Sequence, residues 1–359
     1  MTIERGTGNL LTAEVDALVN TVNTEGVMGK GLALQFKKAF PEAFASYERA
    51  CKAGEVKTGT MHVVQRLASP RFIINFPTKK HWRHPSKLEY IRGGLSDLIR
   101  NVKDRGIRSI AVPPLGCGNG GLAWSEVRPL IAEAFAEVPD VRVVLFEPTE
   151  APAADKIIDR RVRPAMTPAR AAVIALMGRY LETEYEYRLS LLEVQKLAYF
   201  LQEAGEDLRL QYRAHFFGPY ADNLRKALRN IEGHYTRGLG DGRNSPETPL
   251  ELLPGAMEEA RAELRADETS ARLDRVASLI EGFETPFGME LLGTVHWVMR
   301  HGANPDDFAD VAARVHAWSE RKRSQMKDGH IRAAWTRLRE QGWSPSAGRD
   351  SASEAKPNS

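Results

Sequence analysis

The chain has little of what builds covalent or metal frameworks. Its 359 residues include only two cysteines, Cys51 and Cys117. Two cysteines make neither a disulfide framework nor the paired spacing of a zinc site. The sequence also lacks a cluster of His, Asp and Glu with ligand spacing, so we expect no metal.

Long apolar segments are missing as well. No run approaches the roughly 20 residues of a membrane span, and the opening MTIERGTGNL lacks the apolar core of a signal peptide. We therefore expect a soluble cytoplasmic protein without membrane contact. The net charge of +3 neither demands nor excludes nucleic acid, although residues 1–150 are mildly basic, with 20 Lys and Arg against 16 Asp and Glu.

Residues 1–150 alternate between strand-like and helix-like patterns. Such alternation predicts an α/β domain in which helices cover both faces of a sheet, with ligands at the loops beyond the strand ends. Ser86 is the expected N-cap of one helix, and Gly54 and Gly106 are expected helix stops. The predicted strands are 15–20, 61–65, 71–76, 109–115 and 141–148, and the predicted helices are 31–40, 41–54, 86–106 and 125–138.

The rest of the chain has a different character. Residues 151–167 are rich in Pro, Ala and charge and predict a linker, whereas 168–344 predict a mainly α-helical second domain. The small polar residues of 345–359 predict a disordered tail. Helical patterns cover 169–188, 189–205, 221–233, 256–266, 272–284, 286–300 and 328–342, and loops are expected at 215–220 and 238–249.

The segment VNTVNTEGVMGKG, residues 19–31, joins a predicted strand to a predicted helix. Glycines let backbone N–H groups approach an oxygen-rich ligand, and a helix N-terminus attracts anions. Asn20 and Asn23 could bind ribose hydroxyls. By itself the segment is equally well explained as a glycine-rich turn.

A second glycine-rich loop, PPLGCGNGGLAW at 113–124, also lies between a strand and a helix. Two such loops can enclose a diphosphate from both sides. Neither loop has the spacing of the G-x-x-x-x-G-K-[ST] phosphate loop or of a dinucleotide fingerprint. The pair predicts a different kind of diphosphate pocket.

A third segment, FPTKKHWRHP, follows the predicted strand 71–76. A lysine here could contact nucleic-acid phosphate, or attack an anomeric carbon if its amine is kept unprotonated. Trp82 with Arg83 could stack on single-stranded DNA. The alternatives are that the lysines are solvated surface charge and that Trp82 is a half-buried packing residue.

These three segments together resemble the macrodomain family. The resemblance covers about residues 1–150 and is closest to the branch that holds the human terminal ADP-ribose glycohydrolase and the bacterial DarG antitoxins. It implies ADP-ribose as ligand and product, no cofactor, and hydrolysis of ADP-ribose from thymidine in single-stranded DNA modified by a DarT-type toxin. It also implies that Lys79 is the catalytic residue, with Lys80 as the alternative if the register differs by one.

The resemblance further implies a set of binding residues. Lys80, Trp82 and Arg83 are the candidates for DNA contact. The candidates for ADP-ribose contact are Asn9, Asn20, Asn23, Gly26, Val27, Met28, Gly29, Gly31, Thr78, Gly116, Cys117, Gly118, Asn119, Gly120 and Gly121.

Two positions depart from the family pattern. Asn9 stands where many macrodomains have an aspartate that contacts the adenine amine, and its carbonyl oxygen could accept the same bond more weakly. Gly120 stands where the human enzyme has a catalytic aspartate, so this chain has no lysine–aspartate dyad. His81 is a candidate acid or base, although a surface histidine is the simpler interpretation.

Residues 168–344 resemble the SocA-like antitoxin domain, which implies a protein-binding module with a DarT-type toxin as partner. No catalytic group is evident there. The aromatic segment 215–220 is either contact surface or a turn anchored to the core. Two other functions stay open for the whole chain: a non-catalytic ADP-ribose reader, and a glycohydrolase that acts on ADP-ribosylated protein.

Overall fold

The computed structural model describes residues 2–150, 152–182, 189–242, 244–264 and 267–344. The chain forms two compact units, Met1–Val162 with Gly240–Arg243, and Arg163–Leu239 with Asn244–Ser359. The boundary at Val162 falls inside the predicted linker 151–167. The predicted tail 345–359 lies outside the described residues.

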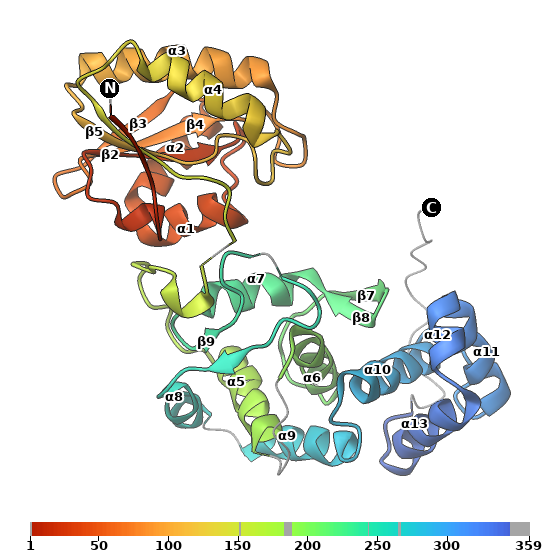
Figure 1. The fold of residues 1–359 in the computed structure, drawn as a ribbon. Coiled ribbons are helices and arrows are strands. Elements are labelled where there is room, and N and C mark those ends of the chain that lie inside the picture. Colours follow the sequence, from red (N-terminus) through yellow and green to blue (C-terminus); the bar gives the residue numbers. More distant parts are fainter. Residues whose placement is uncertain (1, 151, 183–188, 243, 265–266, 345–359) are drawn as a thin grey trace. The chain divides into compact units, whose positions relative to one another are not determined.

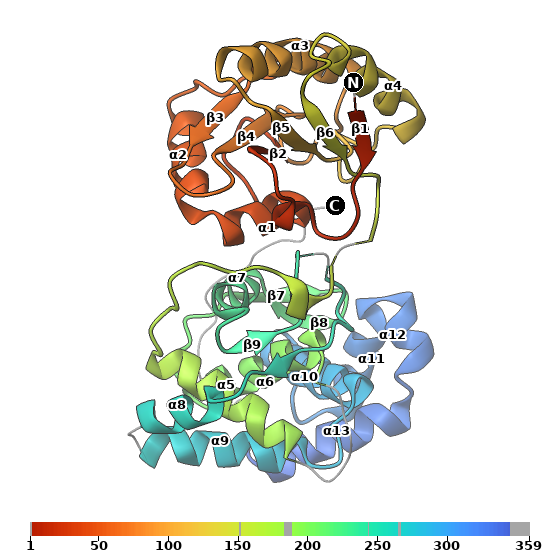
Figure 2. The same ribbon diagram turned by 60° about the vertical axis from the view of Figure 1, so that its left-hand side comes forward.

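The first unit is built on a six-stranded sheet in the order β1-β6-β5-β2-β4-β3 (Figures 1 and 2). Only β3 runs antiparallel to its neighbour, β4. Parallel strands covered on both faces read as continuous apolar runs, and every residue of β4 is buried. The strands are β1 Thr2–Arg5, β2 Ala17–Val22, β3 His62–Gln65, β4 Phe72–Pro77, β5 Ser109–Val112 and β6 Arg142–Leu145.

Helices cover both faces of this sheet, as predicted (Figures 1 and 2). Helices α1 (Gly31–Ala39) and α2 (Pro41–Lys52) pack on one face, and α3 (Leu88–Asp104) and α4 (Trp124–Phe135) pack on the other. Strand β1 was not predicted, because four residues of alternating polarity at the sheet edge give little pattern. Short 3-10 turns at Leu10–Thr12 and Ala154–Lys156 complete this unit.

Local signals set the ends of these helices. Pro41 begins α2, where its missing N–H costs nothing. The predicted stops Gly54 and Gly106 both adopt positive φ directly after a helix cap. The predicted N-cap Ser86 is wrong: α3 begins at Leu88, and the Ser86 side chain is buried instead.

The second unit is mainly helical, as predicted. Its helices are α5 Pro168–Leu181, α6 Leu191–Glu203, α7 Asp222–Ile231, α8 Ala256–Glu263, α9 Asp267–Ile280, α10 Pro286–Arg300, α11 Phe308–Trp318, α12 Glu320–Gln325 and α13 Asp328–Glu340. Helices α11 and α12 were not predicted. The predicted helix 169–188 ends at Leu181, and its last residues, 183–188, lie outside the described ones. None of the helices in the described part of the chain has the length and hydropathy that a bilayer span requires.

The segment 215–220 was predicted as a loop, but most of it is strand: β7 (Tyr212–His215) pairs with β8 (Gly218–Ala221) as a hairpin, and only Phe216 and Phe217 form its turn. A second short pair joins β9 (Thr236–Arg237) to β10 (Glu251–Leu252). Phe216 is 51% exposed at the hairpin turn. The guanidinium of Arg321 lies 4.8 Å from the ring centres of Phe216 and Phe217.

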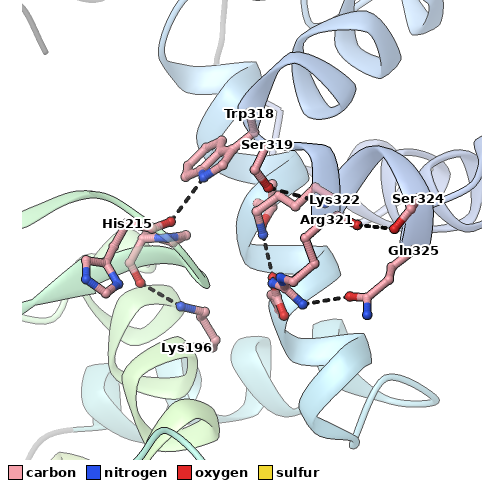
Figure 3. Close-up of polar contacts among 11 residues, drawn as sticks. Lys196, His215, Trp318, Ser319, Arg321, Lys322, Ser324 and Gln325 are labelled. Atoms are coloured by element: carbon pink, nitrogen blue, oxygen red, sulfur yellow. Dashed lines mark hydrogen bonds and ion pairs between the residues drawn. The ribbon is translucent and has the colours of Figure 1, made fainter. Parts of the chain in front are cut away.

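The buried Lys196 side chain and the Trp318 indole tie this hairpin to the helices (Figure 3). The Lys196 amine, on α6, donates to the Pro219 carbonyl at 2.7 Å, and the Trp318 indole donates to the His215 carbonyl at 3.0 Å. Lys322 donates to a Glu290 carboxylate oxygen at 2.5 Å. The turn is therefore anchored to the core, although Phe216 stays available as contact surface.

The environment of Lys196 disfavours its charge. Its side chain is only 1% exposed. Burial lowers the pKa of Lys196 to about 7, the charge of Lys322 lowers it further, and Glu290 opposes the shift. Between about 7 and the ordinary value of 10.5, the unfolded chain therefore holds more protons at this position than the folded chain. The free energy of unfolding must rise with pH across that window.

We expect Lys196→Met to flatten this pH dependence. In the wild type, Lys196 alone should add roughly 2 kcal/mol to the free energy of unfolding between about pH 7 and pH 9. Calorimetric unfolding of the full chain at both pH values measures the difference. The exposed Lys226→Met is the control and should keep the wild-type slope. Equal slopes in wild type and Lys196→Met would contradict the assignment.

Candidate active site

Three loops meet at one edge of the sheet because β5, β2 and β4 are parallel neighbours. The carboxyl ends of parallel neighbours open at the same edge, which is where α/β sheets bind ligands. The three glycine- and lysine-rich segments of the sequence follow these three strands. The fold therefore brings together segments 19–31, 77–84 and 113–124.

The candidate binding residues differ in accessibility. Those that are buried form the floor, and those that are exposed form the loop tips. Gly26, Met28, Gly31, Thr78, Gly116 and Gly120 are buried, Gly29 and Cys117 are half-buried, and Val27, Gly118, Asn119 and Gly121 are exposed.

Asn23 holds the first loop in shape. Its amide nitrogen donates to the Val27 carbonyl at 2.6 Å, and its side-chain oxygen accepts from the Glu25 N–H at 2.9 Å. The Tyr47 hydroxyl donates to the Asn23 carbonyl at 2.6 Å. Asn23 was predicted to face a ribose, but the structure turns its side chain into its own loop. The turn needs a positive φ at Gly26, which glycine adopts without strain.

Asn20 lies beneath this loop, in β2. Its side chain is 0% exposed. The amide nitrogen donates to the Asn75 side-chain oxygen at 3.0 Å, whereas the Asn20 side-chain oxygen has no hydrogen-bond partner in the protein. A buried carbonyl without a donor is costly, so this oxygen is suited to a ligand hydroxyl.

The second loop is closed tightly on itself and on the start of α3. The Ser86 N–H donates to the Gly120 carbonyl at 2.9 Å, and the Leu122 N–H donates to the Gly116 carbonyl at 3.1 Å. A Cβ at Gly120 would lie 2.2 Å from the Gly116 oxygen and 2.3 Å from the Ser86 hydroxyl. No side chain fits there, which gives a physical reason for the missing aspartate.

Lys79 bridges the loops that follow β4 and β5. It is 9% exposed, and its amine donates to the Asn119 carbonyl. Burial lowers the pKa of Lys79, which increases the fraction of neutral, nucleophilic amine. Lys80 is exposed, and its amine lies 5.9 Å from the ring centre of Tyr90. The geometry thus favours Lys79 over Lys80 as the reactive lysine.

Cys117 adds no second nucleophile to the loop. Burial raises the pKa of its thiol to about 11. The thiolate is the reactive form of cysteine, so at neutral pH Cys117 is a small apolar lining residue. Among the described residues, no group of three or more His, Cys, Asp and Glu side chains could hold a metal ion.

Exposed rings stand beside Lys79, on the segment that follows it. Trp82 is 46% exposed, so nearly half of its surface is open to a ligand. The Arg83 guanidinium lies 4.5 Å from its ring centre, and the His81 ring stacks on it at 5.6 Å. This arrangement offers a cation and a flat apolar surface, which is what a single-stranded base needs.

His81 is held in place by its own neighbours. Its Nδ1 accepts from the Arg83 N–H at 3.1 Å. The proton of the neutral ring is then on Nε2, which lies 3.5 Å from the Glu25 carboxylate. His81 thus links the segment after β4 to the first loop, which favours a structural role over the acid or base role.

Asn9 is placed apart from the other candidates. It follows β1, which β6 separates from β5 in the sheet. Its side-chain oxygen accepts from the Leu11 N–H at 3.0 Å and so caps a short 3-10 turn. A carbonyl oxygen has a second lone pair, so the predicted contact with adenine stays a prediction.

Three functional candidates were missed by the sequence analysis. Asn75 and His62 continue the hydrogen bonding of Asn20, and Ser86 supports the second loop. Asn75 did carry a signal, because a polar residue inside the apolar strand FIINF must find a buried partner. His62 and Ser86 gave no comparable signal.

The tight second loop generates a prediction. We expect Gly120→Ala to lower the thermal stability by about 1–3 kcal/mol and to weaken ADP-ribose binding, because backbone atoms of the loop must move. Gly93→Ala, at an exposed position of α3 with ordinary contacts, is the control. Thermal unfolding and titration calorimetry measure both. Equal tolerance of the two substitutions would contradict the account of the loop.

Comparison with known proteins places this site in a family. The Macro domain family matches residues 19–131. The macrodomain of Mycobacterium tuberculosis DarG, a solved structure, is 57% identical and has a TM-score of 0.41, covering 41% of this chain and 99% of that one.

Two further relatives match this chain. A DNA ADP-ribosyl transferase–DNA ADP-ribosyl glycohydrolase fusion protein of Thermosipho africanus is 35% identical over 160 residues, 40% of this chain and 41% of that protein. A DNA ADP-ribosyl glycohydrolase of Thermus aquaticus is 49% identical over 342 residues, 93% of this chain and 92% of that protein. Because that identity spans nearly the whole of both proteins, the chain belongs to the DNA ADP-ribosyl glycohydrolase family.

Proposed function

We propose that the protein is an antitoxin enzyme that hydrolyses ADP-ribose from thymidine in single-stranded DNA and so reverses a DarT-type ADP-ribosyltransferase. The observation that carries the proposal is Lys79, a buried lysine of lowered pKa whose amine donates to the Asn119 carbonyl of the second glycine-rich loop. Family membership supports the reaction class. Exposed Trp82 and Arg83 beside the site support DNA as the substrate.

The backbone would bind the diphosphate. The loop from Gly116 to Gly121 presents N–H groups to an anion without bulky side chains, whereas the Gly31 N–H at the start of α1 already donates to the Asp241 carbonyl at 2.7 Å. Asn20 offers a buried acceptor to the distal ribose. Holding the sugar and the lysine together would supply much of the rate enhancement.

The reaction breaks the N-glycosidic bond at C1″. The bonding electrons stay on the thymine nitrogen, which takes up a proton, and the oxygen of water ends on C1″. Lys79 either adds to C1″ as a neutral amine and is displaced by water, or stays charged and stabilises the departing base. Because Gly120 leaves no carboxylate beside it, the lysine acts without an aspartate partner. Free ADP-ribose and intact DNA are the products, and no cofactor takes part.

We expect Lys79→Ala to lower kcat by at least about 100-fold while ADP-ribose still binds. Lys80→Ala is the matched neighbour and should raise KM, most of all at low salt, with little change in kcat. The assay uses a single-stranded oligonucleotide with one ADP-ribosylated thymidine and measures the release of ADP-ribose by the full chain. If the rate at which the wild type releases ADP-ribose rises with pH through the lowered pKa of Lys79, the neutral amine is the active form.

The outcomes separate the alternatives. A wild-type chain that binds ADP-ribose but leaves the oligonucleotide modified would be a reader or would act on protein. ADP-ribosylated protein offered in the same assay distinguishes these two. Unchanged turnover in Lys79→Ala with loss in Lys80→Ala would move the catalytic role to Lys80.

We propose further that the second unit binds the toxin. The Thermosipho africanus relative carries a DNA ADP-ribosyl transferase and a glycohydrolase in one chain, which favours physical association of the two activities. The second unit has its own large core and, by its resemblance to SocA-like domains, is a protein-binding module. Phe216 is an exposed contact candidate on its hairpin.

We therefore expect full-length Lys79→Ala to co-purify with a catalytically inactive DarT-type toxin and to protect cells partly from the active one. Phe216→Ala, which shortens an exposed side chain, should weaken co-purification without lowering turnover. Complete loss of both co-purification and protection in Lys79→Ala would show that neutralisation rests on hydrolysis alone.

A further inference from the structure

Three polar side chains form a row across the first unit's sheet. Asn20 on β2 is in register with Asn75 on β4, and Asn75 is in register with His62 on β3. The Asn20 amide donates to the Asn75 oxygen at 3.0 Å, and the Asn75 amide nitrogen lies 3.1 Å from His62 Nδ1. Beyond the row, His62 Nε2 lies 3.4 Å from the Ser46 hydroxyl on α2.

The direction of every bond in this row follows from the first one. Because the Asn75 oxygen accepts from Asn20, Asn75 has only its NH₂ group to offer His62. His62 Nδ1 must therefore accept, and the proton of the neutral ring must be on Nε2, where it points to Ser46. The row has one consistent polarity, which ends with the Asn20 oxygen.

The environment of His62 favours these donor and acceptor roles. Burial lowers the pKa of His62, against an opposing attraction from Glu55. The Tyr47 ring meets the imidazole edge-on, with ring centres 6.2 Å apart. The imidazole is therefore neutral near pH 7 and is packed in one orientation.

The other end of the row, at Asn20, has an atom without a hydrogen-bond partner. The Asn20 side chain is completely buried, its NH₂ group is used by Asn75, and its oxygen has no partner. An asparagine amide is free to turn over unless its neighbours fix it. In the arrangement of this structure the unpaired atom is the Asn20 oxygen, which can meet only a hydrogen-bond donor.

We propose that His62 and Asn75 are positioning residues that lock Asn20 as an acceptor for a hydroxyl of the distal ribose. The inference rests on the proposed binding of ADP-ribose at this site. It makes the site selective for a sugar hydroxyl over a group that can only accept. Neither His62 nor Asn75 needs to touch the ligand.

The row also predicts that the affinity for ADP-ribose depends on pH. A protonated His62 has a hydrogen on Nδ1, which would face the NH₂ group of Asn75. Asn75 would have to turn its oxygen to His62 and its NH₂ to Asn20, and Asn20 would then present NH₂ to the ribose. Affinity for ADP-ribose should therefore fall as the pH drops through the pKa of His62, which burial lowers from its ordinary value of 6.5.

The test compares ADP-ribose with ADP, which lacks the distal ribose, by titration calorimetry on the full chain. His62→Leu should weaken ADP-ribose binding about tenfold at pH 7.5, the value of one hydrogen bond, and leave ADP binding unchanged. Gln65→Leu, at an exposed position of the same strand, is the control and should change neither.

His62→Gln is the conservative variant. Its side-chain oxygen can accept from Asn75 but cannot be protonated in this range. We expect it to keep affinity within about threefold at pH 7.5 and to lose the decrease at acid pH that the wild type shows. This variant also tests the inference if His62→Leu fails to fold.

Several results would overturn the inference. Equal losses for ADP-ribose and ADP would mean that the row only supports the fold. If His62→Leu bound ADP-ribose with wild-type affinity, His62 would have no positioning role. The same would follow if the affinity of His62→Gln still fell at acid pH as it does in the wild type. The proposed function would stand in both cases. A wild-type chain that binds neither ligand would overturn the proposed function itself, and the inference with it.

Discussion

The site depends on one constraint, the parallel side-by-side order of β5, β2 and β4. That order sends three loops, far apart in sequence, to one edge of the sheet. The Lys79 amine then closes the edge by donating to the Asn119 carbonyl across two of these loops. A reversed strand in this trio would send its loop to the opposite edge. The glycine loops and the lysine have chemical meaning only because of this shared edge.

Burial decides the chemistry that these groups can perform. Lys79 is desolvated and becomes less basic, whereas Cys117 is desolvated and becomes less acidic, so one amine and no thiolate is available. Gly120 admits no carboxylate, since Ser86 and the Gly116 carbonyl occupy the space. The proposed mechanism therefore uses a lysine whose pKa is lowered by burial, together with positioning, and needs no aspartate at position 120. The same burial leaves the Asn20 side-chain oxygen without a hydrogen-bond partner in the protein, so a donor on a ligand could bind it.

The two units use buried polar groups for different purposes. In the first, the buried Asn20 side-chain oxygen has no partner in the protein. In the second, Lys196 is bonded to the hairpin carbonyl of Pro219, and Lys322 to Glu290 and Thr294 (Figure 3). Satisfied groups of that kind hold a surface hairpin rigid. A rigid hairpin with Phe216 exposed suits a protein-binding unit, because little conformational entropy is lost on association.

The sequence by itself determined the local structure and the kinds of residue at the site. Hydrophobic periodicity, Pro41, Gly54 and Gly106 define helices through interactions within a few residues, and Asp307, which caps α11, would have revealed that helix too. Only the tertiary structure showed that Lys79 is buried and Lys80 exposed, because adjacent residues leaving a strand point to opposite sides. It also turned Ser86 from a cap into a support for the second loop, and it joined Asn20 to Asn75 and His62. Those partners come from strands far apart in sequence, and no local pattern records which strands become neighbours.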